Sequence, residues 1–215
     1  MKVLRLFLIV LAAIVPFVSR AADPDPWENY DEAMFMDMDL DANIASPALS
    51  SDKERRAVRR YIGELGKRVA EKGYIVETDR DDEVMVVTIP LEKLFLPNDT
   101  LLRAGFEKTL RPLIGFLKDP GMFKVVYAVH SDNTGSENYN YDLSNERVAS
   151  IYDWLLDNIS EDLIVIPFAM GDTDPIESNM TRDGRRQNRR LEIFFVPGPE
   201  LIMRARKGST YYLAA

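Results

Sequence analysis

Hydrophobic positions along the chain follow two periods, one typical of helices and one typical of strands. Beyond residue 50, apolar residues recur every three or four positions in three stretches, which predicts three amphipathic helices. The first begins at Ser51-x-x-Glu54, a capping-box pattern, and Gly73 can end it. The second is expected to begin at 98–100, and the third covers 138–158. The three apolar stripes are Val58, Ile62, Leu65 and Val69; Leu102, Phe106, Leu110, Leu113 and Leu117; and Val148, Ile151, Tyr152 and Leu155.

Shorter apolar runs between these helices predict strands. Residues 74–89 resemble a hairpin with a charged turn at 79–82, and further strands are expected at 124–130, 164–169 and 191–196. A polar loop and a short helical piece precede the last of these strands. The order predicts a two-layer α/β sandwich in which helices cover one face of a mixed sheet.

The ends of the chain differ in character from its middle. Residues 1–21 have a positive start and a thirteen-residue apolar run, which predicts an export signal peptide. That run is shorter than the roughly 20 residues needed to cross a bilayer, although an uncleaved anchor stays an alternative. The segment 22–50 is acidic, with nine acidic and no basic residues in 23–52. Residues 197–215 form a C-terminal extension whose apolar residues could pack back on the domain.

Composition limits the chemistry that the chain can perform. Its 215 residues allow one domain with extensions, and the absence of cysteine excludes disulfides and thiolate metal sites. The single histidine, His130, excludes sites that need two histidine ligands, and we expect no cofactor. The net charge of −8 becomes −11 when the three basic residues of 1–21 are removed. Such a body repels nucleic acid and anionic lipid surfaces.

One loop and the helix after it carry a candidate binding site. Asp132 follows the strand 124–130, in a loop of small polar residues. On the helix, Asn140, Leu143, Ser144 and Arg147 have the spacing that places them on one face. An anion, a planar cation and the free N–H groups of the helix start would together suit a ligand with an ammonium and a carboxylate. The alternative is a salt bridge between Asp132 and Arg147 that ties the loop to the helix.

Four motifs occur in a fixed order over residues 84–196. They are Val129-His130-Ser131-Asp132-Asn133-Thr134-Gly135, Asn140-x-x-Leu143-Ser144-x-x-Arg147-Val148, Ala169-Met170-Gly171 ahead of Pro175, and Asn188-Arg189-Arg190-Leu191-Glu192. Together they resemble the OmpA-like peptidoglycan-binding domain family, which includes the periplasmic domain of outer-membrane protein A, peptidoglycan-associated lipoproteins and flagellar stator subunits. The resemblance implies the family's βαβαββ arrangement, with residues 51–83 leading into the domain.

The resemblance also implies roles for particular residues. Asp132 and Arg147 match the pair that holds diaminopimelate of the peptidoglycan stem peptide. The other implied site residues are Asn140 and Leu143 as lining, Thr134 and Asn133 in the loop, and Arg189 nearby. The chain departs from the family pattern at Val129, where glycine is usual, at Ser131, where threonine is usual, and at Val148, where alanine is usual.

The resulting expectation is a non-catalytic peptidoglycan-binding protein in the periplasm of a Gram-negative bacterium. It would anchor an envelope assembly to the cell wall, and a partner protein could link it to the outer membrane. The alternative is a protein-interaction module of the envelope that retains the fold. An enzyme is not expected, because the sequence has one histidine, no cysteine and no carboxylate pair with a catalytic spacing.

Overall fold

The computed structural model describes residues 39–45 and 49–208 of the chain. The predicted signal peptide, most of the acidic segment and the last seven residues of the C-terminal extension lie outside this part. No helix within the described residues is sufficiently long and apolar to cross a membrane.

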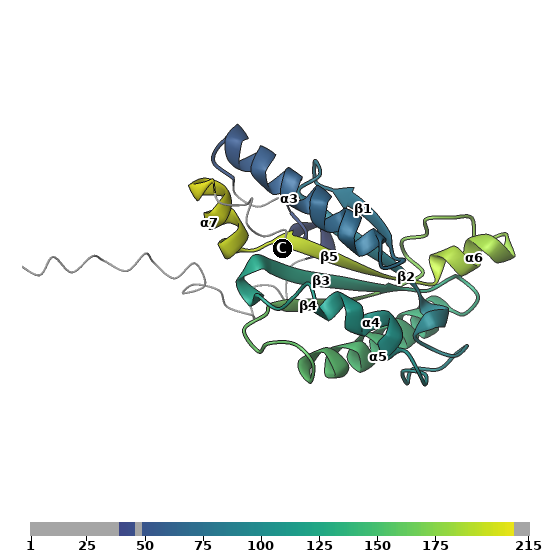
Figure 1. Ribbon diagram of the computed structural model, residues 1–215. Coiled ribbons are helices and arrows are strands. Elements are labelled where there is room, and N and C mark those ends of the chain that lie inside the picture. Colours follow the sequence, from purple (N-terminus) through teal and green to yellow (C-terminus); the bar gives the residue numbers. More distant parts are fainter. Residues whose placement is uncertain (1–38, 46–48, 209–215) are drawn as a thin grey trace, which may run out of the picture. The chain divides into compact units, whose positions relative to one another are not determined.

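Five strands form one mixed sheet, as the sequence predicts (Figure 1). The strands are β1 (Ile75–Asp79), β2 (Val84–Pro90), β3 (Phe123–His130), β4 (Val165–Gly171) and β5 (Arg190–Pro197), in the order β1-β2-β5-β3-β4. Only β3 and β4 are parallel, and α5 (Glu137–Leu156) connects them. The last strand therefore lies in the middle of the sheet, where it brings the Asn188-Arg189-Arg190 motif beside the end of β3.

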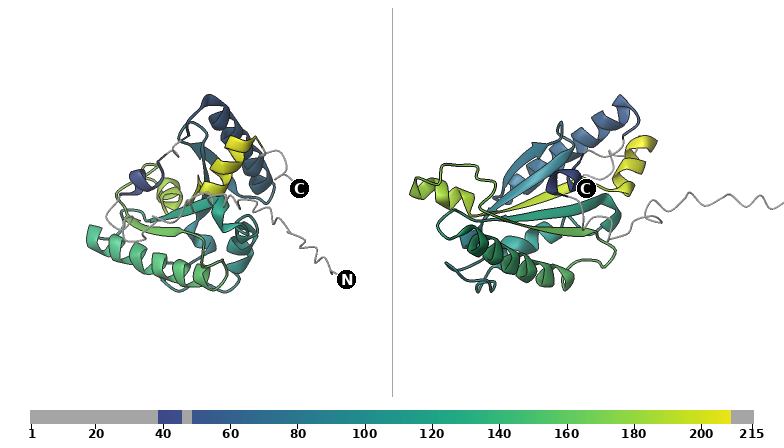
Figure 2. Two further views of the ribbon diagram at one scale, coloured as in Figure 1. Left: turned by 90° about the vertical axis from the view of Figure 1, so that its left-hand side faces the viewer. Right: turned by 180° about the vertical axis from the view of Figure 1, so that it is seen from behind.

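The longer helices pack on one face of the sheet. They are α3 (Asp52–Ala70), α4 (Glu107–Ile114), α5 and α7 (Pro199–Lys207), and all four contribute to one apolar cluster with the strands. The one-turn helix α2 (Leu40–Asn43) contributes to a second cluster on the opposite face, and α6 (Arg182–Asn188) precedes β5. Two 3-10 turns, η1 (Leu91–Lys93) and η2 (Pro120–Met122), complete the elements, and Figure 2 shows the arrangement in two further views.

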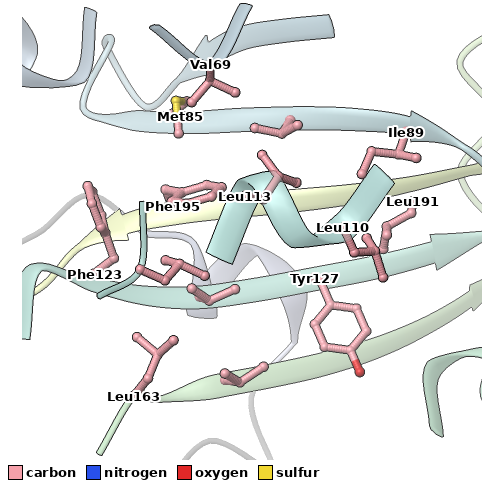
Figure 3. Packing of buried hydrophobic residues seen from close by; sticks show 14 of the residues in the cluster. Val69, Met85, Ile89, Leu110, Leu113, Phe123, Tyr127, Leu163, Leu191 and Phe195 are labelled. Atoms are coloured by element: carbon pink, nitrogen blue, oxygen red, sulfur yellow. The ribbon is translucent and has the colours of Figure 1, made fainter. Parts of the chain in front are cut away.

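Alternate residues of each central strand belong to the two apolar clusters on opposite faces of the sheet. Met85, Phe195 and Tyr127 belong to the helix-covered cluster and lie among its side chains in Figure 3. The Tyr127 hydroxyl donates a 2.9 Å hydrogen bond to the carbonyl oxygen of Val148, which ties β3 to α5. Val129 and Val148 are buried in this same cluster. The two valines that depart from the family pattern therefore fill the core.

Local sequence signals account for the boundaries of α3. Ser51 is its N-cap and accepts a 3.3 Å hydrogen bond from the backbone N–H of Glu54. The Glu54 carboxylate accepts a 3.0 Å hydrogen bond from the backbone N–H of Ser50. A regular capping box would use the N–H of the N-cap residue, Ser51, so this bond is displaced by one residue. Gly73 has a φ of +88°, which lets the chain reverse into β1.

The prediction of a helix that begins at residues 98–100 was wrong, because α4 begins at Glu107. Asp99 does accept hydrogen bonds from the backbone N–H groups of Thr100 (2.8 Å) and Leu101 (3.1 Å). These bonds close a local turn, and a strand-like bridge between Phe95 and Leu102 then holds the segment as a loop. This loop forms one wall of the candidate site.

Candidate functional site

A cavity of about 530 Å³ lies where β3 ends, between the 91–98 loop and α5. Its lining includes Asp132, Thr134, Asn140, Leu143, Arg147 and Arg189, which are six of the seven predicted site residues. Asn133 is exposed and is not among the lining residues. The structure thus brings together residues that are up to 57 positions apart in the chain.

The first wall of the cavity is the loop between β3 and α5. The N–H of Ser131 donates a 2.6 Å hydrogen bond to the carbonyl oxygen of Gly171, which fixes the loop to the end of β4. Ser136 then caps α5 by accepting a 3.3 Å hydrogen bond from the N–H of Tyr139. Gly135 sits so tightly that an added Cβ would lie 2.5 Å from the Tyr139 ring. A glycine at this position lets the helix start approach the loop.

The Asp132 carboxylate is buried and held at both oxygens, with 7% of the residue exposed. Oδ1 accepts a 2.8 Å hydrogen bond from the N–H of Thr134, and Oδ2 forms an ion pair with Arg189. Burial raises the pKa of Asp132, but the bonds from Thr134 and Arg189 outweigh it, so the pKa is below its ordinary value. The Asp132–Arg147 salt bridge considered from the sequence is not formed, because Arg189 takes that place.

Arg147 provides the buried cation of the cavity. It is 4% exposed, its Nε donates a 2.9 Å hydrogen bond to the carbonyl oxygen of Asp99, and its Cζ lies 5.1 Å from the centroid of the Phe95 ring. Burial lowers its pKa. Within residues 39–45 and 49–208 it has no ion-pair partner, and its two terminal nitrogens make no hydrogen bond. The guanidinium is thus fixed in orientation, and Asp99 and Asp132 interact with it electrostatically without forming an ion pair.

Phe95 and Asp99 are site residues that the sequence did not identify. The sequence pattern places Asp99 in a predicted helix start. Both contacts to Arg147 join segments about fifty residues apart. No local pattern carries that information.

A second ionic group lies on the opposite side of the sheet. Arg190 is 1% exposed; its Nε lies 2.7 Å from Glu192 Oε1, and its Nη2 lies 3.3 Å from Asp174 Oδ2. His130 Nε2 lies 3.1 Å from Glu192 Oε2. Burial raises the pKa of Glu192, but His130 and Arg190 outweigh it and bring the pKa to about 2. Arg189, the residue before β5, and Arg190, its first residue, therefore point to different sites.

This ionic group is also the candidate for a metal centre among the described residues. His130, Asp174 and Glu192 each offer a ligand atom, and these atoms lie within 4.8 Å of one another. The guanidinium of Arg190, however, already binds both carboxylates. The donor set is therefore neutralised by an internal cation and fits a metal ion poorly.

Comparison with known proteins connects this cavity to one family. Residues 94–189 match the family described as OmpA family. The chain is 27% identical over 126 residues to "Probable lipoprotein YiaD" of Escherichia coli, covering 59% of this chain and 58% of that protein. It is 39% identical over 64 residues to "Peptidoglycan-binding protein ArfA" of Mycobacterium tuberculosis, covering 30% of this chain and 20% of that protein. The chain thus matches less than two thirds of the length of either relative.

Solved structures agree with the fold. A MotB-like protein from Desulfovibrio vulgaris superposes with a TM-score of 0.57 at 20% identity, covering 67% of this chain and 95% of that chain. A structure described as the cell wall anchor of the T6SS from Pseudomonas aeruginosa gives a TM-score of 0.52 at 26% identity, covering 65% of this chain and 99% of that chain.

Proposed function

We propose that the chain, whose residues 94–189 match the OmpA family, binds peptidoglycan without catalysis and anchors an envelope assembly to the cell wall. Two relatives support the wall as the ligand, since one is named a peptidoglycan-binding protein and the other a cell wall anchor. The predicted signal peptide would deliver the protein to the periplasm of a Gram-negative bacterium. A link to the outer membrane would then come from a partner protein.

We propose that the cavity holds the diaminopimelate of the stem peptide. The observation that carries this proposal is Arg147, a cation buried at 4% exposure and without an ion-pair partner among the described residues. A buried charge without an ion-pair partner is costly, so the cavity favours a ligand that brings an anion. The free end of diaminopimelate offers a carboxylate, and the two terminal nitrogens of Arg147 can bind it bidentately.

Asp132 is the partner for the ligand's ammonium group. Its two oxygens already accept one bond each, and a carboxylate has about four lone-pair positions, so acceptor capacity remains. Arg189 lies beside it as a second cation and adds to the attraction for carboxylates. Each charge-assisted hydrogen bond contributes roughly 1.5–3 kcal/mol net when it is well formed, which fits reversible binding.

The same groups are suited to recognition and poorly suited to bond cleavage. A general acid or base is most effective when its pKa lies near the working pH. The pKa of Asp132 is shifted downward, away from neutrality, and Arg147 stays charged. The side chains therefore supply fixed charges, which is what a non-catalytic anchor requires.

Co-sedimentation with purified peptidoglycan and NMR titration with free diaminopimelate test the proposal. Arg147→Gln and Asp132→Asn should each reduce retention on the wall and weaken the titration. Arg56→Gln is the matched control, since it removes an exposed arginine of α3 that forms no ion pair with any described residue. Retention that is equal in all four proteins would contradict the proposed site. Unchanged spectra with diaminopimelate would favour the interaction module.

A further inference from the structure

A second cavity, of about 680 Å³, lies on the opposite face of the sheet from the diaminopimelate site. Its floor is made by residues of β1, β2 and β5 that point away from the longer helices. Among them, Ile75 pairs with Thr88, and Thr88 pairs with Glu192. Its other wall is the segment 176–187, which includes part of α6. We call this cavity the acidic groove.

The accessible charge in the acidic groove is negative. Glu77, Glu177 and Asp183 line it, are exposed, and form no ion pair with any residue that the structure describes. The two lining arginines are both engaged: Arg186 Nη2 lies 2.6 Å from Glu92 Oε1, and Arg190 binds Glu192 and Asp174. A cationic occupant would therefore meet three exposed carboxylates, of which Asp183 also interacts electrostatically with Arg186.

The groove is also partly apolar. Ile75 is 56% exposed and Ile176 is 52% exposed, and they lie on the floor and on the opposite wall. Large aliphatic side chains at such exposure on two facing elements favour an occupant with an aliphatic part. A simple inorganic cation would leave both isoleucines in water.

The groove opens beside the free edge of the sheet. β1 is the outermost strand, and within the described residues it pairs with β2 alone. An edge strand presents unpaired N–H and C=O groups to which an extended peptide can add. Every second side chain of such a peptide would point to the face that carries Ile75 and Glu77.

We propose that the acidic groove binds an extended basic peptide segment of a partner protein, which pairs with β1 and places basic and aliphatic side chains in the groove. Charge complementarity with Glu77, Glu177 and Asp183 identifies the basic side chains, and the two isoleucines identify the aliphatic ones. The domain would then bind the wall on one face of the sheet and a partner on the other.

The test uses the full chain and a blocked seven-residue peptide with lysine at its first, third and seventh positions, valine at its fifth and serine at the others, so that all lysine and valine side chains point to one face when it is extended. NMR titration should shift resonances of β1 and of the segment 176–187, and the affinity should fall as salt is added. The triple variant Glu77→Gln, Glu177→Gln, Asp183→Asn should bind roughly tenfold more weakly, because three exposed ion pairs are lost. The matched control Glu146→Gln, Glu161→Gln, Asp153→Asn removes three exposed carboxylates that do not line the groove, and should bind like the wild type.

Several results would overturn the proposal. Equal binding of a glutamate–valine peptide would remove the role of charge, and equal binding of spermidine would remove the role of the peptide. Self-association that the triple variant abolishes would assign the groove to a second copy of this chain. Loss of peptide binding in Asp132→Asn would show that the groove is not a separate site.

Discussion

Replacing the partly buried carboxylate of Glu192 should change how the stability of the domain depends on pH. Interactions with His130 and Arg190 bring the pKa of Glu192 to about 2, against an ordinary value of 4.5. One pKa unit corresponds to about 1.4 kcal/mol, so the ionised carboxylate contributes about 3 kcal/mol to the free energy of unfolding. Because the folded-state pKa is the lower one, this contribution is complete above pH 4.5 and is lost as the pH falls toward 2.

Urea unfolding followed by circular dichroism, at several pH values between 2 and 7, measures this effect. The difference in unfolding free energy between the wild type and Glu192→Gln should shrink by about 3 kcal/mol over that range. Glu161→Gln is the control, because the same change at this exposed residue removes no ion pair of the described structure. If the unfolding free energies of wild type and Glu192→Gln run parallel from pH 7 to pH 2, His130 and Arg190 do not stabilise the ionised form of Glu192.

Three further predictions concern the site and the fold. Because the pKa of Asp132 lies below its ordinary value, NMR titrations should show diaminopimelate affinity maintained from pH 7 to pH 4.5, and an earlier decline would contradict the role of this carboxylate. Gly184→Ala should lower the free energy of unfolding by about 2 kcal/mol in urea titrations, because the new Cβ would lie 2.1 Å from the carbonyl oxygen of Ser178; an unchanged midpoint would refute this. Ser51→Ala should cost about 1 kcal/mol by the same measurement, since the N–H of Glu54 loses its cap, and a neutral result would show that the cap is dispensable.

Local patterns in the sequence were sufficient to predict most of the helices and strands. The helices α3 and α5 and all five strands lie where periodicity and capping residues predict them. The error at residues 98–100 has a physical cause. Asp99 satisfies neighbouring backbone N–H groups in a turn as well as it would at a helix start, and the bridge from Phe95 to Leu102 decides between the two. That bridge is a tertiary constraint that a one-dimensional pattern does not contain.

Only those residues of the candidate site that lie close together in the sequence could be predicted. Helical spacing placed Asn140 and Arg147 on one face, and the structure puts both in the cavity. The partners of the two charges could not be predicted in the same way. Asp132 pairs with Arg189 and Arg147 bonds to Asp99, across 57 and 48 positions of the chain. The sequence offered a bridge between Asp132 and Arg147, and the fold instead gives each of them a distant partner.

One short motif serves both faces of the sheet. Arg189 is the residue before β5 and Arg190 is its first residue, and their side chains line different cavities. Arg189 lines the cavity with its side chain 40% exposed, whereas the side chain of Arg190 is 2% exposed and neutralises Glu192 and Asp174. Arg190 bonds to Glu192 of the same strand and to Asp174 of the loop after β4, so it fixes the start of β5 beside that loop. Arg190 therefore helps to position its neighbour Arg189, which lines the cavity.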